Sequence, residues 1–199
     1  MPKKRFDLDE SIGARHWLTA NIVDTYGRAT LAERADGTYW YPSAHALAKQ
    51  LGGRQGAATG AGVIAALSPA TSWDQNQVLA VRAFTDGRAT GHTGLFCSRA
   101  DAILGGADPL DVLGGDKVRA FYACILDPSD PWTVCVDRHA YDIAIGYVTD
   151  DTTRKVLARV GAYDHVAQAY RDAADVLDLL PSVVQAVTWV AWRARLSAG

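Results

Sequence analysis

The segment VCVDRHAYDIAIG, residues 134–146, places an aspartate where two roles are open to it. An apolar run ends at Asp137, and a segment typical of a helix follows directly, beginning with Arg138 and His139. An aspartate there caps the helix by accepting free backbone N–H groups of its first turn. It can also act as a catalytic carboxylate that stabilises positive charge in a transition state. We predict a catalytic role for Asp137, which is compatible with capping. Arg138 and His139 are candidate substrate-binding residues, with a structural hydrogen bond favoured for His139.

A lysine at the start of another expected helix offers a nucleophile. The segment GGDKVRAFY, residues 114–122, turns at two glycines and then reaches Lys117. A lysine amine can form a Schiff base with a sugar when desolvation or a cationic neighbour keeps it neutral. Arg119 and Arg138 are candidates for that neighbour or for a phosphate contact. We therefore predict Lys117 as a second catalytic residue, with a solvated lysine as the structural alternative.

The segment SPATSWDQN, residues 68–76, is a polar corner between two expected helices. Its candidate substrate-binding residues are Ser68, Ser72, Trp73, Gln75 and Asn76. The indole of Trp73 can stack on a flipped base, and the amides of Gln75 or Asn76 can read its hydrogen-bonding edge. Ser72 is equally what a helix start requires, so the functional and the structural interpretations both stay open.

The elements that position these residues show helical periodicity almost throughout. The expected helices cover residues 12–26, 43–51, 58–67, 73–84, 98–104, 117–126, 153–160, 164–177 and 182–196. Residues 58–67 are small or aliphatic, which predicts a buried central helix, and residues 39–42 (YWYP) predict an aromatic turn. Residues 133–136 are strand-like but too few to require a sheet. The pattern predicts an all-α fold of about nine helices.

Composition limits the classes of protein that are possible. The chain has 199 residues, 49% of them hydrophobic, which suffices for one helical domain over residues 1–199, with two lobes around a cleft as a variant. Its 20 basic and 22 acidic residues give a net charge of −2. This balance excludes a global basic field, so any contact with DNA must be local. The oligomeric state is left open.

The cysteines and the absence of long apolar runs bear on metal binding and on the cellular compartment of the protein. Cys97, Cys124 and Cys135 are odd in number and lack CxxC spacing, which argues against a disulfide framework, a zinc site or an iron–sulfur cluster. We therefore expect no metal and no cofactor. No segment reaches about 18 uninterrupted apolar residues, and the first ten residues lack an apolar core. These features predict a soluble cytoplasmic protein without a membrane partner.

Three of these segments occur in an order that resembles a known superfamily. A helix breaking at SPATSW, a glycine turn before DKVRAF, and VDRHA after it resemble the helix-hairpin-helix DNA glycosylases, the group that includes endonuclease III. The resemblance covers residues 58–146. It implies a glycosylase-like bundle in which Gly114, Gly115 and Arg119 contact the DNA backbone and Asp137 is the essential acid.

The departures from the superfamily pattern lie in the hairpin. The family hairpin usually reads Leu-Pro-Gly-Val-Gly, whereas this chain has Leu113, Gly114, Gly115 and Asp116, so it offers fewer backbone amides and an acid to a phosphate. The chain is also similar to small proteins of actinobacterial phages with the same three segments. It is further similar to the α-glutamyl/putrescinyl thymine pyrophosphorylase group, which is proposed to act on hypermodified thymine. In a phage setting the protein would work in the bacterial host cytoplasm.

The main alternatives for the function are therefore an enzyme and a binding protein. The resemblance implies a DNA base-processing enzyme that acts on a flipped nucleotide, by cleaving an N-glycosidic bond or by modifying a base. The rival is a non-catalytic phage DNA-binding or inhibitor protein on the same scaffold, which the acidic net charge favours. A small-molecule enzyme using the same cleft is the third alternative.

Overall fold

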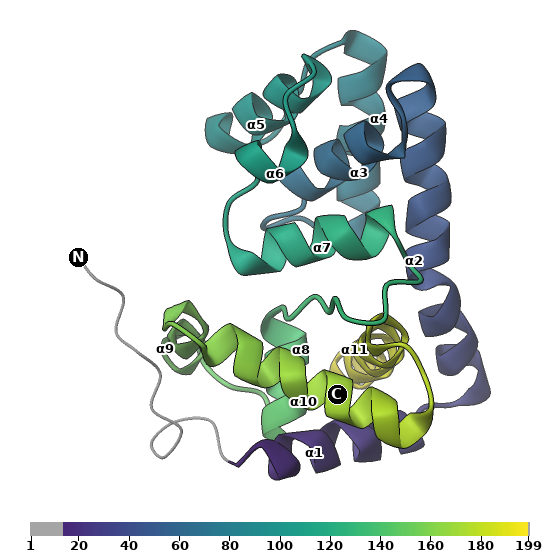
Figure 1. The fold of residues 1–199 in the computed structure, drawn as a ribbon, viewed down its shortest axis with the longest axis vertical. Helices are drawn as coiled ribbons and strands as arrows, with labels where there is room; N and C mark the ends of the chain where they lie inside the picture. The colour runs from purple at the N-terminus through teal and green to yellow at the C-terminus, as the bar shows by residue number, and fades with distance from the viewer. Residues whose placement is uncertain (1–13, 199) are drawn as a thin grey trace. The chain divides into compact units, whose positions relative to one another are not determined.

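The protein is described by a computed structural model over residues 14–198. Within this range it is all-α, as predicted, with eleven α-helices, two 3₁₀-helices and no β-strand (Figure 1). The elements are α1 (Arg15–Gly27), α2 (Leu31–Gly52), η1 (Gly53–Gln55), α3 (Ala57–Ala66), α4 (Trp73–Asp86), α5 (Gly94–Leu104), α6 (Pro109–Val112), α7 (Asp116–Leu126), α8 (Arg138–Ile145), α9 (Asp151–Arg154), η2 (Lys155–Ala158), α10 (Ala162–Leu177) and α11 (Pro181–Ala198).

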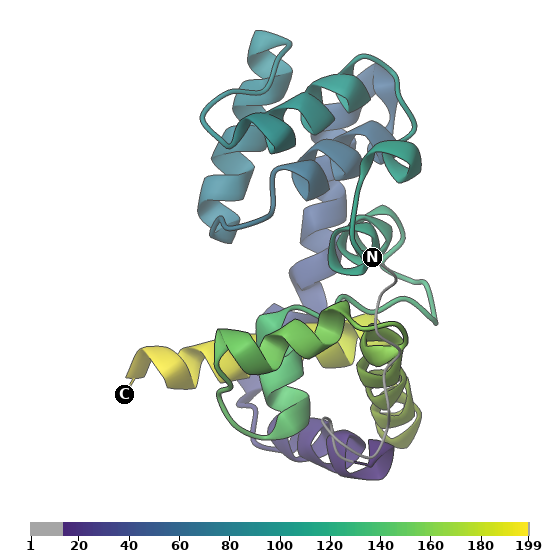
Figure 2. The ribbon, with the colours of Figure 1, turned by 90° about the vertical axis from the view of Figure 1, so that its left-hand side faces the viewer.

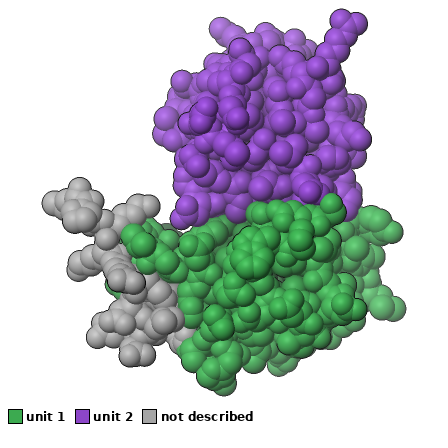
Figure 3. All heavy atoms as spheres, viewed as in Figure 1, with its two compact units in different colours: residues 1–41, 129–199 green, residues 42–128 purple. Residues whose placement is uncertain are grey.

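The chain divides into two compact units (Figure 3). Unit 1 combines residues up to 41 with those from 129 onward, and unit 2 consists of residues 42–128. The sequence of unit 2 is thus inserted between the two segments of unit 1. Each unit is described by itself below.

Unit 1 is built from helices that lie far apart in the sequence. Helix α1 packs against α8, α10 and α11, and Figures 1 and 2 show these four helices grouped together. Their shared core contains Leu18 and Ile22 of α1 with Tyr141, Tyr170 and Val184 of the later helices. Because helices from the second segment cover the apolar stripe of α1, the two segments bury this core together.

Unit 2 is organised around α3, as the apolar composition of residues 58–67 predicts. This helix contacts α4, α5, α6 and α7, and residues 60–66 are all buried. A Cβ atom at Gly60 would lie 1.9 Å from the carbonyl oxygen of Ala48 in α2. The two backbones are therefore in direct contact at Gly60, which no larger residue would permit.

The predicted aromatic turn at residues 39–42 is wrong, because α2 continues through it with Pro42 inside the helix. The helix begins at a capping box in which Glu33 Oε2 accepts from the Thr30 N–H at 2.7 Å and Thr30 Oγ1 accepts from the Glu33 N–H at 3.2 Å. Its passage beside α11 requires Gly37, where a Cβ would lie 2.4 Å from Val187 Cα. A proline costs a helix one hydrogen bond, and the packing of α2 outweighs that cost here.

Most other boundaries differ by about one turn, but the helix predicted over residues 153–160 is instead the short α9 followed by the 3₁₀-helix η2, which ends at Ala158. Helix α1 begins at Arg15, and its predicted first residues lie outside the described range. Helix α5 begins at Gly94, before the predicted start at residue 98, and the N–H groups of Phe96 and Cys97 bond to Thr93 O. The short helix α6 precedes the glycine turn, and its four residues are too few to show a helical period. Residues 133–136 are extended without forming a strand, which agrees with their small number.

Candidate functional site

Asp137 is the N-cap of α8, so the capping interpretation is confirmed. Its Oδ1 accepts a hydrogen bond from the Ala140 N–H at 2.8 Å. The extended segment before it is buried and is held by Tyr163, whose hydroxyl accepts from the Val136 N–H at 2.9 Å and donates to Val134 O at 3.2 Å. Asp137 itself is only half-buried, so a capping role leaves part of its carboxylate accessible.

The second carboxylate oxygen of Asp137 has a partner that the sequence did not reveal. The indole Nε1–H of Trp189, in α11, donates to Asp137 Oδ2 at 3.0 Å. Both oxygens are therefore oriented by donors that carry no formal charge, one from the backbone of α8 and one from a side chain 52 residues away. The C-terminal helix gives no local signal for this contact, since its tryptophans are equally typical of a buried face.

Aromatic rings and one cation surround Trp189. The ring of His139 meets it edge-on at a centroid distance of 6.2 Å, and the ring of Trp40 does so at 6.4 Å. The guanidinium carbon of Arg193 lies 4.8 Å from the Trp189 ring centroid. Unit 1 thus holds a carboxylate, three aromatic rings and an exposed guanidinium in one cluster, which we name the Asp137 cluster.

His139 belongs to this cluster, and its hydrogen bond is to its neighbour. Arg138 Nε donates to His139 Nε2 at 3.3 Å, while the buried His139 Nδ1 has no partner among residues 14–198. Burial lowers the pKa of His139 most, and the charges of Arg138 and Arg193 lower it further, whereas Asp137 and Asp142 oppose them. A neutral imidazole is therefore favoured here, because it can accept from Arg138 without adding a third positive charge.

The polar corner at residues 68–76 lies in unit 2 and is held by several hydrogen bonds. Ala70 has a φ of 58°, a left-handed conformation that is unusual for a residue with a Cβ. Thr71 Oγ1 donates to Leu67 O and Ser68 O, and Pro69 O lies 2.9 Å from His92 Nε2. These hydrogen bonds hold the backbone in a turn that includes the unfavourable left-handed conformation of Ala70.

The side chains of the corner divide between structure and surface. Ser72 caps α4 by accepting from the Gln75 N–H at 3.2 Å, which confirms its structural role, and the side chain of Gln75 is exposed. Asn76 is 2% exposed and donates to Ile64 O at 3.0 Å, so it ties α4 to α3. Ser68 Oγ is buried without a partner in the described part of the chain, and Trp73 is half-buried.

The glycine hairpin also lies in unit 2. Gly115 has a φ of 81° and precedes α7, and the neighbouring Gly114 would place a Cβ 2.8 Å from Arg99 Nη2. Arg119 Nε donates to Leu113 O at 2.8 Å, so this predicted DNA contact has a structural bond within the turn. Lys117 is half-buried, with its amine 5.5 Å from the Phe121 ring centroid. Arg99 is a cation beside the hairpin that no motif in the sequence indicates.

The predicted site residues are thus divided between the units. Asp137, Arg138 and His139 lie in unit 1, and the structure brings them together with Trp40, Trp189 and Arg193. The remaining predicted residues, from the corner and the hairpin, lie in unit 2.

A buried ion pair in unit 1 was not foreseen. Asp142 is fully buried and accepts from Arg154 Nη2 at 2.7 Å, Arg154 Nε at 3.2 Å and the Thr149 N–H at 3.1 Å. The hydrogen bond to Asp142 raises the pKa of Arg154 above its ordinary value. The only sequence signal is a charge inside the apolar run AYDIA, and that signal does not name the partner.

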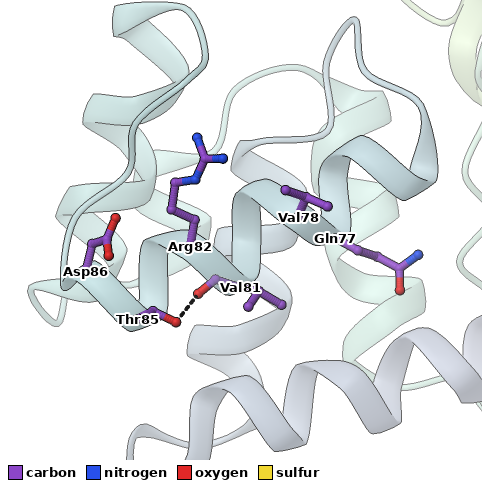
Figure 4. Close-up of a pocket in the computed structure, with 6 residues that line it drawn as sticks. All are labelled: Gln77, Val78, Val81, Arg82, Thr85 and Asp86. Carbon is purple, nitrogen blue, oxygen red and sulfur yellow. Dashed lines mark hydrogen bonds between the residues drawn. The ribbon is translucent and has the colours of Figure 1, made fainter.

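A shallow hollow of about 390 Å³ lies along α4, and none of the predicted site residues lines it (Figure 4). It is lined by Gln77, Val78, Val81, Arg82, Thr85 and Asp86. All six come from one helix, and the Thr85 hydroxyl bonds back to Val81 O. The hollow offers an exposed apolar stripe with one charge of each sign, and it holds no convergent polar groups for catalysis.

Two further searches concern metals and membranes. Within residues 14–198 no three His, Cys, Asp or Glu side chains gather as a metal site would require. In the same range no single helix is long and apolar enough to cross a membrane, although α10 and α11 reach that length together across a bend of 98°.

Fold and site define an all-α protein with a half-buried, aromatic-flanked carboxylate in the unit formed by both ends of the chain. Residues 7–196 match a family described as a family of unknown function (DUF7178), and the chain belongs to this family. The match spans both units. No curated protein and no solved structure matches the chain, and the resemblance to helix-hairpin-helix glycosylases stays a prediction.

Proposed function

We propose that this protein processes DNA bases, acting on a nucleotide flipped out of the helix, with Asp137 as the catalytic carboxylate. The observation that carries the proposal is the environment of Asp137. Its two oxygens are oriented by the Ala140 N–H and the Trp189 Nε1–H, and the group remains half-buried beside aromatic rings. A charge held in a fixed orientation is what electrostatic stabilisation of a transition state requires.

The donors that hold Asp137 do not neutralise it. A backbone amide and an indole carry no formal charge, so the carboxylate keeps its capacity to attract a developing cation. When an N-glycosidic bond breaks, positive charge develops on the deoxyribose. A water molecule then adds to C1′, its proton leaves with the base, and the bond between C1′ and the base nitrogen is replaced by a C1′–O bond. Asp137 would stabilise the charged sugar or orient that water.

The aromatic groups support a base as the ligand. A flipped base exposes two apolar faces and needs flat partners, and the indole of Trp40 in the Asp137 cluster can be one of them. The exposed guanidinium groups of Arg138 and Arg193 are suited to the flanking phosphates. These cations are local, which agrees with the net charge of −2.

The test is release of base from defined duplexes. The wild-type protein is incubated with duplexes carrying damaged and phage-modified bases, and free base is measured by mass spectrometry. Asp137→Asn should lower turnover by roughly 10² or more, because removing one preorganised electrostatic partner typically costs about 2.7 kcal/mol or more. The matched control is Asp150→Asn, since exposed Asp150 caps α9 through the Thr153 N–H at 2.6 Å. Equal turnover in the wild type and Asp137→Asn would contradict the proposal.

The role of Lys117 is decided on the same substrate. If its amine attacks the sugar, borohydride should trap a covalent adduct with the wild type, and Lys117→Ala should abolish that adduct. If water is the nucleophile, no adduct forms and Lys117→Ala keeps its turnover. Lys49→Ala is the control, because Lys49 is an exposed lysine of the same unit with no predicted role.

A non-catalytic DNA-binding or inhibitor protein is the second candidate. Its inhibitor form is favoured by the acidic net charge and by the structural bond from Arg119 to Leu113 O, because both weaken contacts with a DNA backbone. This candidate predicts DNA or protein binding without release of base from any duplex in the panel. Asp137→Asn would then leave binding unchanged.

A further inference from the structure

We propose that Trp189 is a positioning residue that fixes the orientation of the Asp137 carboxylate. This inference deepens the proposed function and rests on it for its effect on turnover. The indole Nε1–H donates to Asp137 Oδ2 at 3.0 Å, while the Ala140 N–H donates to Oδ1 at 2.8 Å. The two donors come from different helices, α11 and α8, that meet in unit 1.

Two hydrogen-bond donors restrict the Asp137 carboxylate more than one donor does. The Ala140 N–H belongs to the helix that Asp137 caps. A cap of this kind holds one carboxylate oxygen and leaves the second oxygen free to shift. A donor on the other oxygen removes that freedom. An indole is suited to the task because it can only donate and because its rigid ring carries the N–H at a fixed place.

The ring of Trp189 is itself held from several sides. Trp40 and His139 meet it edge-on, and Arg193 lies over its face at 4.8 Å. Its neighbours on α11 are also tied down, since the Thr188 hydroxyl donates to Val184 O at 2.9 Å and the Tyr41 hydroxyl donates to Gln185 Oε1 at 2.8 Å. The position of the donor is therefore determined by packing, so the carboxylate needs little reorganisation during the reaction.

The same helix supplies a matched control. Trp192 follows Trp189 by three residues and packs against the unit 1 core, yet its buried Nε1 has no hydrogen-bond partner within residues 14–198. Replacing either tryptophan with phenylalanine removes an indole N–H and a similar volume. Only Trp189→Phe removes a donor to a carboxylate.

The first measurement separates kcat from KM. On a substrate of the proposed class, Trp189→Phe should lower kcat by roughly 10- to 100-fold, as is typical when a residue that orients a catalytic group is removed. KM should change by less than about threefold, because the substrate-contacting groups remain. Trp192→Phe should keep kcat within about twofold. An active Trp189→Phe enzyme with the wild-type kcat would overturn the proposal.

The second measurement needs no substrate. The indole ¹H–¹⁵N resonance of Trp189 is identified by its loss in Trp189→Phe. An asparagine at position 137 has only one acceptor oxygen, so it cannot serve both donors. In Asp137→Asn the Trp189 resonance should therefore shift, and the Trp192 resonance should not. An unshifted Trp189 resonance would overturn the proposal.

The two measurements fail separately. If the wild type releases no base from any duplex, the proposed function fails, and the resonance experiment alone supports or overturns the contact between Trp189 and Asp137. If the wild type is active and the resonance shifts, but Trp189→Phe keeps full turnover, the positioning role fails while the proposed function stands.

Discussion

Two aspartates, one at the start of helix α8 and one within it, differ in burial and in the charge of their hydrogen-bond partners. Asp137 starts the helix, is half-buried, and is bound by the neutral donors of Ala140 and Trp189. Asp142 is fully buried and is bound by the guanidinium group of Arg154 in two hydrogen bonds. The charge of Asp142 is thus already compensated, whereas that of Asp137 is oriented but not compensated. A carboxylate that is buried against an opposite charge indicates a structural role. A carboxylate that is oriented by neutral donors keeps a negative charge that can act on a substrate.

The largest effect on stability is expected at Asp142. Asp142→Asn leaves Arg154 without its counter-charge, and breaking such a pair from one side typically costs 3 kcal/mol or more; we expect about 3 kcal/mol because the Arg154 side chain keeps 18% of its exposure. Urea denaturation measures this loss. The control is Asp151→Asn, since Asp151 pairs with the same arginine at 3.0 Å but is 95% exposed, and it should cost no more than about 0.5 kcal/mol. Similar losses in both variants would refute the distinction.

A smaller loss of stability is expected at Asp137. Asp137→Asn keeps a side-chain oxygen that can accept from the Ala140 N–H, so the free energy of unfolding should fall by no more than about 1 kcal/mol. The same urea titrations compare it with Asp150→Asn, which alters an N-cap alone. A loss above about 2 kcal/mol, or an unfolded variant, would assign Asp137 to structure and would remove the contrast with Asp142.

The smallest effect is a slope in stability against pH near His139. Burial and two arginines lower its pKa below the ordinary value, so between the two values the unfolded chain binds more protons than the folded one. Stability should therefore fall as the pH drops below about 6.5 toward the lowered pKa, and His139 should contribute nothing to the slope above that pH.

The measurement is the free energy of unfolding between pH 8 and pH 5. His139→Gln should reduce the slope in the acidic part of this range, whereas the same change at exposed His16 should not. A wild-type slope that His139→Gln leaves unaltered would show that the Asp137 cluster accommodates a protonated imidazole without cost.

Local patterns predicted the helices that local interactions stabilise. The spans of α3, α4, α7 and α10 follow the predicted ranges closely, and Asp137 and Ser72 are N-caps as their positions indicate. The predicted helix over residues 43–51 is the second half of α2, and the first half was missed because Pro42 suggested a break, although the capping box of Thr30 and Glu33 marks the start of the helix in the sequence. A proline is decisive only where packing does not compensate for the missing hydrogen bond.

The partners of the site could not be predicted in the same way. Trp189 lies 52 residues from Asp137, and the contact depends on how α8 and α11 pack. From the sequence alone, the Arg154 side chain could equally face solvent or pair with any of several acids, and only the fold brings it to Asp142. The periodicity of the sequence cannot predict these two contacts, because each depends on how whole helices pack.

The sequence by itself determined that this protein is all-α, that α3 is buried, and that an acid stands at the start of α8, because helical periodicity and capping act over a few residues. The tertiary structure alone decided which acid is compensated and which is oriented. Packing between distant helices brought a guanidinium to Asp142 and an indole to Asp137. The difference between the two lies in the partners, since both residues carry the same carboxylate on the same helix.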